Sequence, residues 1–465
     1  MDAETKGQES FRDHFDSVRE DGKRNWFYPQ KPKGKWHNRR IWFTVLILGI
    51  LFIGPFLHRD GQPLFLFNIL ERKIILFGFF IGPQDYWLFG LLMIAAILLI
   101  VLFTNMLGRL WCGWACPQTV FMEMVFRKIE YAIEGDWNKQ RALDKAPWTP
   151  DKIIKKGSKW VIFFIISFMI ANLLLAYIIG VKELYKLILQ PIGENLGTLS
   201  ALMLFTLIFF FDFAWLRDQA CTVICPYGRL QGVFLDRKST VVAYDHKRGE
   251  PREKLRKGQE RAEGDCINCF QCVHVCPTGI DIRNGTQMEC ISCTACIDAC
   301  DSIMDKVGFE KGLIRYASEE TIINGKSRKL SIRKVSFTVM IIAICSVLGF
   351  ILLNRTDTST TLLRVPGSQY TLTEKGVENL YTYKIFNKTN RAINPEFRLD
   401  HPDGNLNFIG TNQLILEPSG MLEGSVLISI PLSELGKRKT TIKLSVYDKG
   451  VFLEDFTTTF IAPEQ

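Results

Sequence analysis

Cysteine is absent from both ends of this chain: none of its 13 cysteines lies before Cys112 or after Cys345. A small disulfide scaffold spreads its cysteines through a short chain, so a 465-residue chain with clustered cysteines is not one. A dominant sign of charge is also lacking, because 57 basic residues are mixed with 48 acidic ones. Together with a hydrophobic content of 47%, this mixture excludes a disordered or collagen-like chain.

Long apolar runs occur at five places, and each approaches the ~20 residues needed to cross a bilayer. The predicted membrane spans cover residues 41–57, 86–106, 159–180, 198–216 and 335–354. A purely soluble enzyme is therefore excluded. A further apolar stretch, 64–82, carries Glu71, Arg72 and Lys73 at its centre, where charges are expensive in hydrocarbon. We expect that stretch to be interfacial or re-entrant rather than spanning.

Basic residues predict the orientation of the spans. Ten lysines and arginines lie in residues 1–40 and nine in 107–157, against three in 58–85 and two in 181–197. The positive-inside rule then places the N-terminus in the cytoplasm. We expect the first span to be a signal anchor that is not cleaved. With five spans, the segment before the last span is cytoplasmic and the segment after it is periplasmic. Twelve of the 13 cysteines fall in predicted cytoplasmic segments, where thiols stay reduced.

The most specific motif is a double run of cysteines, each with the spacing C-x2-C-x2-C-x3-C. Three thiolates at this spacing wrap one face of an iron–sulfur cube, and the fourth reaches the other cluster. A pair of structural zinc sites is the alternative, but zinc sites usually separate their two cysteine pairs by a longer loop. We expect two crossed [4Fe–4S] ligand sets: Cys266, Cys269, Cys272 and Cys300 for cluster 1, and Cys276, Cys290, Cys293 and Cys296 for cluster 2.

Three features near these cysteines are expected to have no catalytic or ligand role. His274 is expected to be a packing or surface residue that can hydrogen-bond a sulfur, and not a ligand. Asp301 replaces the second proline of the commonest motif, which leaves ligation intact. The basic run in 246–262 is typical of a solvated face, or of one against anionic lipid. It lacks interleaved aromatic residues, so we expect no nucleic-acid partner.

A different pattern, C-x3-C-P, occurs twice, at Cys112 and Cys116 and again at Cys221 and Cys225. Each pair follows the cytoplasmic end of a predicted span, so an internal repeat brings four thiols to one membrane face. Cysteines at i and i+4 share a helical face, whereas the proline after the second cysteine favours a turn. Burial as small apolar side chains is one interpretation. A soft thiolate site for Cu(I), a redox relay and an additional cluster are the others.

Two residues within spans have less specific interpretations. Asp212 is a functional candidate because carboxylates are rare in membrane spans, although it could also snorkel or pair with Arg217. Cys345 stands alone in the last span, where packing is the preferred interpretation. The methionines are scattered without a Met-x-x-Met cluster, which argues against a transport pore.

The C-terminal segment, residues 355–465, has short β-rich stretches punctuated by turn residues. Strands are predicted at 381–386, 413–416, 425–430, 441–446 and 456–460, which favours an antiparallel β-sandwich. The segment has no cysteine for an inter-sheet disulfide, and His401 is its only histidine. No catalytic constellation is recognisable, so we expect a recognition or docking module.

The order of these parts resembles the cytochrome c oxidase accessory protein family, the FixG/RdxA-like proteins also called CcoG. The quinol dehydrogenase subunits of the NapH type share the C-x3-C-P motifs, but the sandwich after a fifth span separates them from this family. The corresponding domains are a basic N-terminus (1–40), a four-helix membrane domain (41–234), a double [4Fe–4S] ferredoxin-like domain (235–334), a fifth transmembrane helix (335–354) and an immunoglobulin-like sandwich (355–465).

The resemblance implies a bacterial inner-membrane protein that assists assembly of a cbb-type cytochrome oxidase by reducing Cu(II) to Cu(I). In such a cupric reductase the eight cluster cysteines would store electrons. The copper-handling or relay thiols would be Cys112, Cys116, Cys221 and Cys225. The implied partners are membrane lipid, oxidase subunits or copper-delivery proteins, and an electron donor that the sequence does not identify. A quinol-linked electron-transfer subunit and a non-enzymatic assembly scaffold remain the alternatives.

Overall fold

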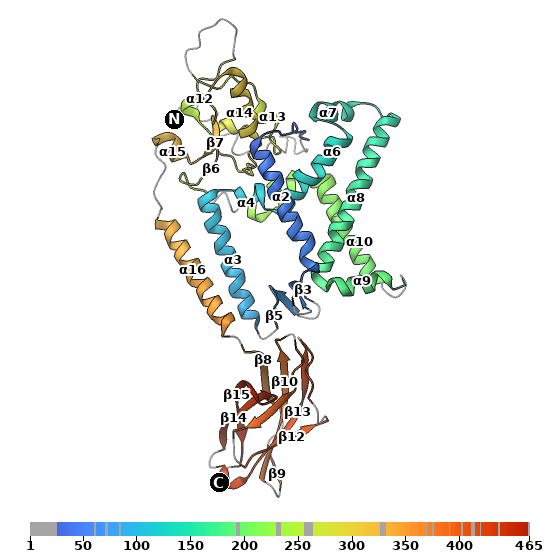
Figure 1. Ribbon diagram of the computed structural model, residues 1–465, viewed down its shortest axis with the longest axis vertical. Helices are drawn as coiled ribbons and strands as arrows, with labels where there is room; N and C mark the ends of the chain where they lie inside the picture. The colour runs from blue at the N-terminus through green and yellow to red at the C-terminus, as the bar shows by residue number, and fades with distance from the viewer. Residues whose placement is uncertain are drawn as a thin grey trace. The chain divides into compact units, whose positions relative to one another are not determined.

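The structure is a computed structural model, shown in Figure 1. It forms two compact units, one comprising residues up to Ile53, Ile94–Leu175 and Tyr185–Ala343, the other Gly54–Met93, Ala176–Leu184 and the chain from Ile344 onward. The residues described are 26–59, 62–69, 73–82, 85–191, 196–228, 234–254, 264–325, 332–354, 356–365, 367, 370–373, 376–389, 391–400, 403–410, 414–418, 420–435 and 438–463.

Among the described residues, five helices are long and apolar enough to cross a membrane, which confirms the five predicted spans. They are α2 (Lys35–Ile53), α3 (Tyr86–Leu107), α8 (Pro150–Ile179), α10 (Leu196–Phe211) and α16 (Ile332–Leu353). Helix α10 continues as a π-helical turn, η5 (Asp212–Leu216). Helix α8 begins nine residues before the predicted span, because its polar first turns continue the same helix beyond the apolar run.

The apolar stretch 64–82 is a small antiparallel sheet and not a helix. Its strands are β3 (Phe65–Asn68), β4 (Lys73–Leu76) and β5 (Phe79–Ile81), paired in the order β3-β4-β5. A two-stranded hairpin, β1 (His58–Arg59) with β2 (Gln62–Pro63), precedes it. Glu71 and Arg72 lie outside the described residues. The described part of this stretch therefore contains no sixth membrane helix.

Short helices follow the second and fourth long helices. After α3 these are α4 (Leu110–Trp114), α5 (Pro117–Phe121), the π-helical η4 (Met122–Phe126), α6 (Arg127–Ile133) and α7 (Trp137–Lys145), and after α10 comes the π-helical η6 (Ala220–Ile224). One more short helix, α9 (Val181–Leu189), lies between the third and fourth long helices. Aromatic rings hold η4 against η5 and α8, since the Phe126 ring stacks on Phe213 at 4.3 Å and meets Phe163 edge-to-face at 4.7 Å between ring centroids. These three rings are almost fully buried.

The ferredoxin-like part is built on one strand pair, β6 (Val241–Tyr244) with β7 (Ile314–Ala317). Between these strands lie α12 (His246–Gly249), α13 (Gln271–His274), the short η7 (Ile282–Asn284) and α14 (Ala295–Val307), and α15 (Glu319–Asn324) follows. Val242, Ile314 and Met304 form its core together with cysteines of the double run. The cysteines are thus part of the packed interior.

The C-terminal part is a β-sandwich of two antiparallel sheets. One sheet has the order β12-β13-β10-β8, with β9 on β10, and the other has the order β11-β14-β15. Side chains from both sheets share one core, and the buried Tyr381 hydroxyl donates across it to the Thr459 carbonyl, 2.9 Å away. The strands are β8 (Thr358–Arg364), β9 (Thr371–Thr373), β10 (Gly376–Asn387), β11 (Pro395–Leu399), β12 (Asn405–Ile409), β13 (Met421–Ile430), β14 (Lys439–Asp448) and β15 (Val451–Ile461).

The predicted strand at 413–416 is wrong. Its described residues contribute a single bridge, in which Leu416 pairs with Ile393. Leu416 is fully buried, so its apolar character reflected a place in the core and not a strand ladder. His401 lies outside the described residues.

Candidate functional site

The two cysteine runs share one unusual backbone conformation. In each run the residues just before and just after the second cysteine have positive φ: Asn268 and Phe270 in the first, Ser292 and Thr294 in the second. Residues other than glycine rarely adopt this conformation, and it persists only where the surroundings impose it. Both runs therefore curl in the same way around a centre, which makes them a structural repeat as well as a sequence repeat.

Each run encloses a cavity with cysteines from both runs in its walls. One cavity is lined by Cys266, Cys269, Cys272 and Cys300. The other is lined by Cys276, Cys290, Cys293 and Cys296, with Cys272 between the two. The crossing arises because α13 and α14 each begin one residue before the third cysteine, and the fourth cysteine follows about one helical turn after the third, just beyond the end of α13 and within α14. The structure thus brings together the two sets expected from the spacing.

The cavities suit a cluster better than a single ion. No three histidine, cysteine, aspartate or glutamate side chains of the described chain are placed to hold one metal ion. A zinc ion would draw four thiolates to about 2.3 Å from one point, whereas a cluster fills a larger apolar cavity between more widely spaced thiols. Burial raises the pKa of the Cys272 and Cys300 thiols to about 12. Metal binding must therefore displace protons from them.

The two cavities differ in their surroundings. In the first set Cys269 is exposed, and the neighbouring Phe270 ring is exposed with the Arg283 guanidinium 4.1 Å above it. In the second set Cys293 is buried and contacts the first C-x3-C-P motif. The first cavity therefore lies near solvent, and the second faces the membrane helices.

The two C-x3-C-P motifs have the same break in the chain. Cys112 lies in α4 and Cys221 in η6, whereas Cys116 and Cys225 are extended, with ψ of 123° and 113°. The proline after each second cysteine disfavours a helical conformation there and begins a new helical turn instead. This resolves the two sequence alternatives, because the first cysteine is helical and the second is in the turn.

The four thiols of these motifs lie in one neighbourhood. Burial raises the pKa of Cys221 to about 12, and the nearby sulfurs of Cys116, Cys112 and Cys225 contribute to this rise. Thr119, which follows the first pair, has its hydroxyl 3.9 Å from the Cys221 sulfur. The internal repeat therefore brings its two halves together at this point.

The first motif is seated directly on the loop of the second cavity. A Cβ atom added to Gly113 would lie 2.3 Å from the Ile291 carbonyl oxygen and 3.0 Å from the Ser292 carbonyl. Only glycine fits there, because the obstructing atoms belong to the backbone. The Gly113 carbonyl in turn accepts from Arg40 Nε at 2.7 Å. The Tyr316 hydroxyl donates to the Ser292 carbonyl at 3.2 Å and closes the contact from the other side.

A carboxylate of the ferredoxin-like part caps the first membrane helix. Asp298 on α14 accepts from the backbone N–H groups of Trp36 and His37, at 3.1 and 2.7 Å. These are N–H groups that a helix cannot satisfy within itself. Gly34 allows the approach, since a Cβ there would lie 2.2 Å from the carboxyl carbon of Asp298. Sequence reasoning missed this contact, which joins residues more than 260 positions apart.

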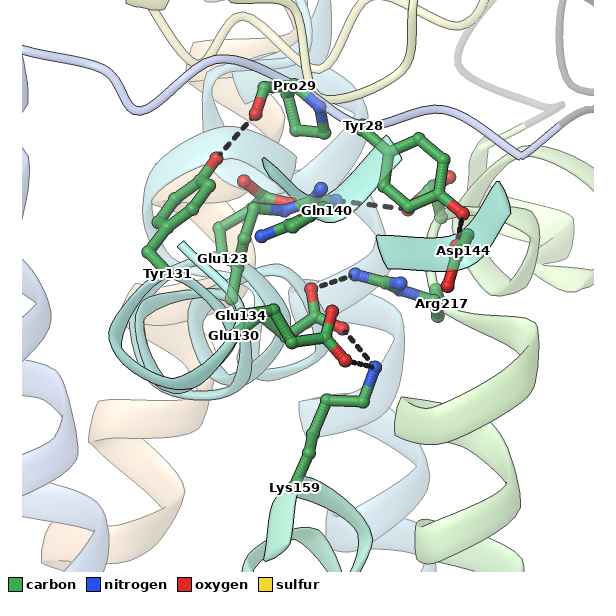
Figure 2. A network of polar contacts seen from close by, with 12 residues as sticks. Tyr28, Pro29, Glu123, Glu130, Tyr131, Glu134, Gln140, Asp144, Lys159 and Arg217 are labelled. Carbon is green, nitrogen blue, oxygen red and sulfur yellow. Dashed lines mark hydrogen bonds and ion pairs between the residues drawn. The ribbon is translucent and has the colours of Figure 1, made fainter. Parts of the chain in front are cut away.

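A buried network of charges lies next to these motifs (Figure 2). Glu130 pairs with Arg217 and with Lys159, and Lys159 also lies 2.8 Å from Glu134. Burial alone would raise the pKa of Glu130, but Arg217 and the other cations outweigh burial and hold it below its usual value. The network joins α6, α8 and the turn after η5.

The remaining predicted residues lie as follows. Arg217 pairs with Glu130 through its side chain and donates only its backbone N–H to the Asp212 carbonyl, so the alternative Asp212–Arg217 side-chain pair does not form. His274 stacks on Trp137, with ring centroids 5.1 Å apart, as a packing residue does. Cys345 is exposed on α16 and is not packed in a protein core.

The basic run 246–262 is described only in part, because residues 255–263 lie outside the described residues. In the described portion Arg248 pairs with Asp265, and Arg252 lies 2.5 Å from Glu250. These pairs fit the solvated face that the mixed charges predicted.

Three family models match the chain. A 4Fe-4S dicluster domain matches residues 216–319, a 4Fe-4S binding domain matches 87–139, and an IG-like fold at the C-terminal of FixG matches 348–463. The dicluster match includes the eight cysteines of the double run, and the second match includes Cys112 and Cys116. Iron–sulfur domains and an immunoglobulin-like C-terminal domain are thereby confirmed.

Curated relatives match most of the chain. Protein RdxB of Cereibacter sphaeroides is 34% identical over 80% of this chain and 81% of its own length. Protein RdxA of the same organism is 32% identical, over 87% of this chain and 86% of its own. The nitrogen fixation protein FixG of Rhizobium meliloti is 37% identical over 64% of this chain and 58% of its own length.

We predict that Gly113→Ala disturbs the second cavity, because the added methyl group meets a backbone carbonyl. Overpacking of this kind costs about 1–3 kcal/mol. The electron paramagnetic resonance spectrum of the reduced protein should change, and its midpoint of thermal unfolding should fall. Gly157→Ala is the matched control, since its Cβ would meet nothing within 4 Å in α8. An unchanged spectrum and midpoint in Gly113→Ala would contradict the prediction.

Glu130→Gln should destabilise the protein by about 3–5 kcal/mol, because it leaves the buried Arg217 without its charged partner. The pKa of Glu130 is lowered in the folded state, so its stabilisation is complete above the ordinary glutamate pKa of about 4.3 and is lost as the pH falls below it. Denaturant unfolding between pH 7 and pH 3 should show that this loss is smaller in the variant.

The control for the charge network is Asp151→Asn, which removes an exposed ion pair with Lys155. Its free energy of unfolding should stay within about 0.5 kcal/mol of the wild type. If Glu130→Gln behaved like this control at every pH, the network would not stabilise the fold.

Proposed function

Because the chain belongs to the FixG/RdxA family of membrane-bound iron–sulfur electron-transfer proteins, we propose that it reduces Cu(II) to Cu(I) during assembly of a cbb-type cytochrome oxidase. The single observation that carries this proposal is the seat of the first C-x3-C-P motif on the loop of the second cavity. Cys112 and Cys293 lie in one packed group there. A soft thiol pair therefore adjoins a site for a one-electron cofactor.

The eight cysteines of the double run would hold two [4Fe–4S] clusters, which supply single electrons when bound. The first set of ligands would be Cys266, Cys269, Cys272 and Cys300, and the second Cys276, Cys290, Cys293 and Cys296. The shared lining residue Cys272 keeps the two cavities adjacent. The exposed Cys269 and Phe270 would face the electron donor, and Cys293 would face the membrane side.

The C-x3-C-P thiols would receive copper as substrate. Thiolates favour Cu(I), so Cys112, Cys116, Cys221 and Cys225 would stabilise the reduced ion. Each Cu(II) takes one electron to become Cu(I), and one reduced cluster becomes oxidised in return. The raised pKa of Cys221 makes binding release a proton from that thiol.

The charge asymmetry of the loops supports one orientation in a bacterial inner membrane. The N-terminus, both cysteine runs and the C-x3-C-P thiols would lie in the cytoplasm, and the sandwich would lie in the periplasm. Reduced thiols and iron–sulfur ligands are retained on the cytoplasmic side. The sandwich would bind an oxidase subunit or a copper-delivery protein.

A second candidate function is favoured by the 4Fe-4S binding domain that matches residues 87–139 and includes Cys112 and Cys116. In that case the four C-x3-C-P cysteines would hold a further cluster or form a relay, and electrons would pass between quinol and a partner protein. The iron and sulfide content of the purified protein separates the candidates, since it equals two clusters in the first and three in an additional-cluster protein.

We expect replacement of Cys112, Cys116, Cys221 and Cys225 by serine to abolish copper reduction while the absorbance of the two clusters persists. Serine removes the soft sulfur ligand but not the eight cluster ligands. The assay mixes dithionite-reduced protein, freed of excess reductant under anaerobic conditions, with Cu(II) and a chromogenic Cu(I) chelator. Chelate colour and cluster re-oxidation are followed together.

Cys345→Ser is the control for this experiment, because its thiol is exposed on α16 and outside the proposed site. It should reduce copper like the wild type. Persistent copper reduction in the quadruple variant would refute the assignment of the four thiols. Reduced clusters that form no Cu(I) in the wild type would refute the reductase and leave the quinol-linked carrier or an assembly scaffold.

The crossed ligand sets predict which single variants resemble one another. Cys276→Ser should alter the same paramagnetic signal as Cys293→Ser, although Cys276 belongs to the other run. Cys300→Ser should likewise match Cys269→Ser. If Cys276→Ser instead matched Cys269→Ser, each run would hold its own cluster and the crossed assignment would be wrong.

A further inference from the structure

A cavity that the proposed electron route does not use lies beside the start of the first membrane helix. Its walls come from residues 31–41 and 123–131. The cavity has a volume of about 530 Å³, within the usual range of small-molecule sites. At one wall the Tyr131 hydroxyl donates to the Pro29 carbonyl at 3.0 Å, as Figure 2 shows.

The cavity is strongly basic. Its charged lining consists of one acid, Glu123, and five lysine and arginine side chains, namely Lys31, Lys33, Arg40, Arg127 and Lys128. Glu123 already pairs with Arg127 at 2.8 Å, and Asp218 pairs with the same arginine at 3.2 Å. Glu123 is therefore not available to neutralise the lysines. The ammonium groups of the three lysines make no ion pair with any part of the chain that the structure describes. The three lysines thus offer positive charge that no acid among the described residues neutralises.

The cations of the cavity also disfavour one another. Burial lowers the pKa of Lys128, and the nearby Lys31 and Arg40 lower it further. An anion in the cavity would relieve this repulsion, since an opposite charge favours the charged form of each lysine. The charges that line the cavity therefore favour a negatively charged ligand.

Arg40 supplies the most specific feature of the cavity. Its side chain is only 4% exposed, and its Nε donates to the Gly113 carbonyl at 2.7 Å. Its Nη2 atom is buried and has no hydrogen-bond partner among the described residues. A buried donor of a charged group without a partner is costly, which points to an acceptor that the protein binds. The guanidinium fork matches the geometry of phosphate oxygens.

The place of the cavity in the chain indicates where such a ligand comes from. Arg40 directly precedes the apolar part of α2, residues 41–53. The cavity therefore lies where the helix leaves the hydrocarbon, at the depth of lipid headgroups. Basic clusters at this depth attract anionic lipids, although a soluble phosphate compound has the same charged group.

We propose that this cavity binds a phosphate group, carried by an anionic membrane lipid or by a soluble phosphate compound, with Arg40 as its central ligand and Lys128 as a wall of positive charge. Arg40 Nε also donates to the Gly113 carbonyl, so the bound phosphate and the first C-x3-C-P motif would contact the same arginine. The site is independent of the proposed copper chemistry, so it stands or falls separately.

The test measures binding to the full-length protein with its clusters intact. Titration calorimetry with inorganic phosphate in detergent is one arm. Retention of phosphatidylglycerol over phosphatidylcholine, measured by native mass spectrometry after extraction from nanodiscs of both lipids, is the other. The variants are Arg40→Gln, Arg40→Lys and Lys128→Gln. Lys145→Gln is the control, because Lys145 is an exposed lysine outside the cavity lining.

We expect Arg40→Gln to weaken binding at least tenfold, Arg40→Lys to weaken it less, and Lys128→Gln to weaken it several-fold, with no change in the control. Lys128 is exposed, so its variant keeps the test valid if Arg40→Gln fails to fold. Selective retention of phosphatidylglycerol identifies a lipid site, and phosphate binding without lipid selectivity identifies a soluble ligand. Both outcomes support the proposal.

Two results would overturn it. One is that neither probe binds the wild type more tightly than it binds the Arg40→Gln and Lys128→Gln variants. The other is that Arg40→Gln changes the paramagnetic signal of the second cluster while affinity for both probes is unchanged. In that second case Arg40 Nη2 would donate a hydrogen bond to the cluster beside Cys293 and not to a phosphate.

Discussion

The contact between Gly113 and the loop around Ser292 is the constraint on which the rest of the first unit depends. Two backbones approach there more closely than any side chain would allow. Hydrogen bonds on both sides stabilise that approach: Arg40 donates to the Gly113 carbonyl, and Tyr316 donates to the Ser292 carbonyl. The first C-x3-C-P motif and the ferredoxin-like part are therefore joined by a close backbone fit, which is reinforced by polar bonds and by the packed group around Cys112 and Cys293.

Repetition explains how so specialised a site arises from ordinary elements. The two cysteine runs use the same pair of left-handed residues, and the two C-x3-C-P motifs use the same helix break at proline. Each repeat supplies half of a site that is complete only when its partner is present. Cys276 and Cys300 express this most clearly, because each lies in the cavity of the opposite run.

Much of the fold could be predicted from the sequence because the deciding interactions are local. Apolar runs set the five long helices of the described chain, and cysteine spacing set the two groups of cysteines that line the cavities. The pairing of Glu130 with Arg217 could not be predicted in this way, since 87 residues separate them and nothing local marks them as partners. The same holds for Asp298 at the start of α2. In the sandwich, Leu416 was mistaken for part of a strand because burial and strand pairing have the same apolar signature.

The cap that Asp298 provides also sets an order of events during synthesis. Helix α2 is the first of the long helices to be made, yet the backbone N–H groups of Trp36 and His37 wait for a carboxylate about 260 residues later in the chain. That carboxylate lies on the helix that carries Cys296 and Cys300. The start of α2 is therefore completed only after the ferredoxin-like part has been made, so a chain that stops before Asp298 keeps an uncapped helix end.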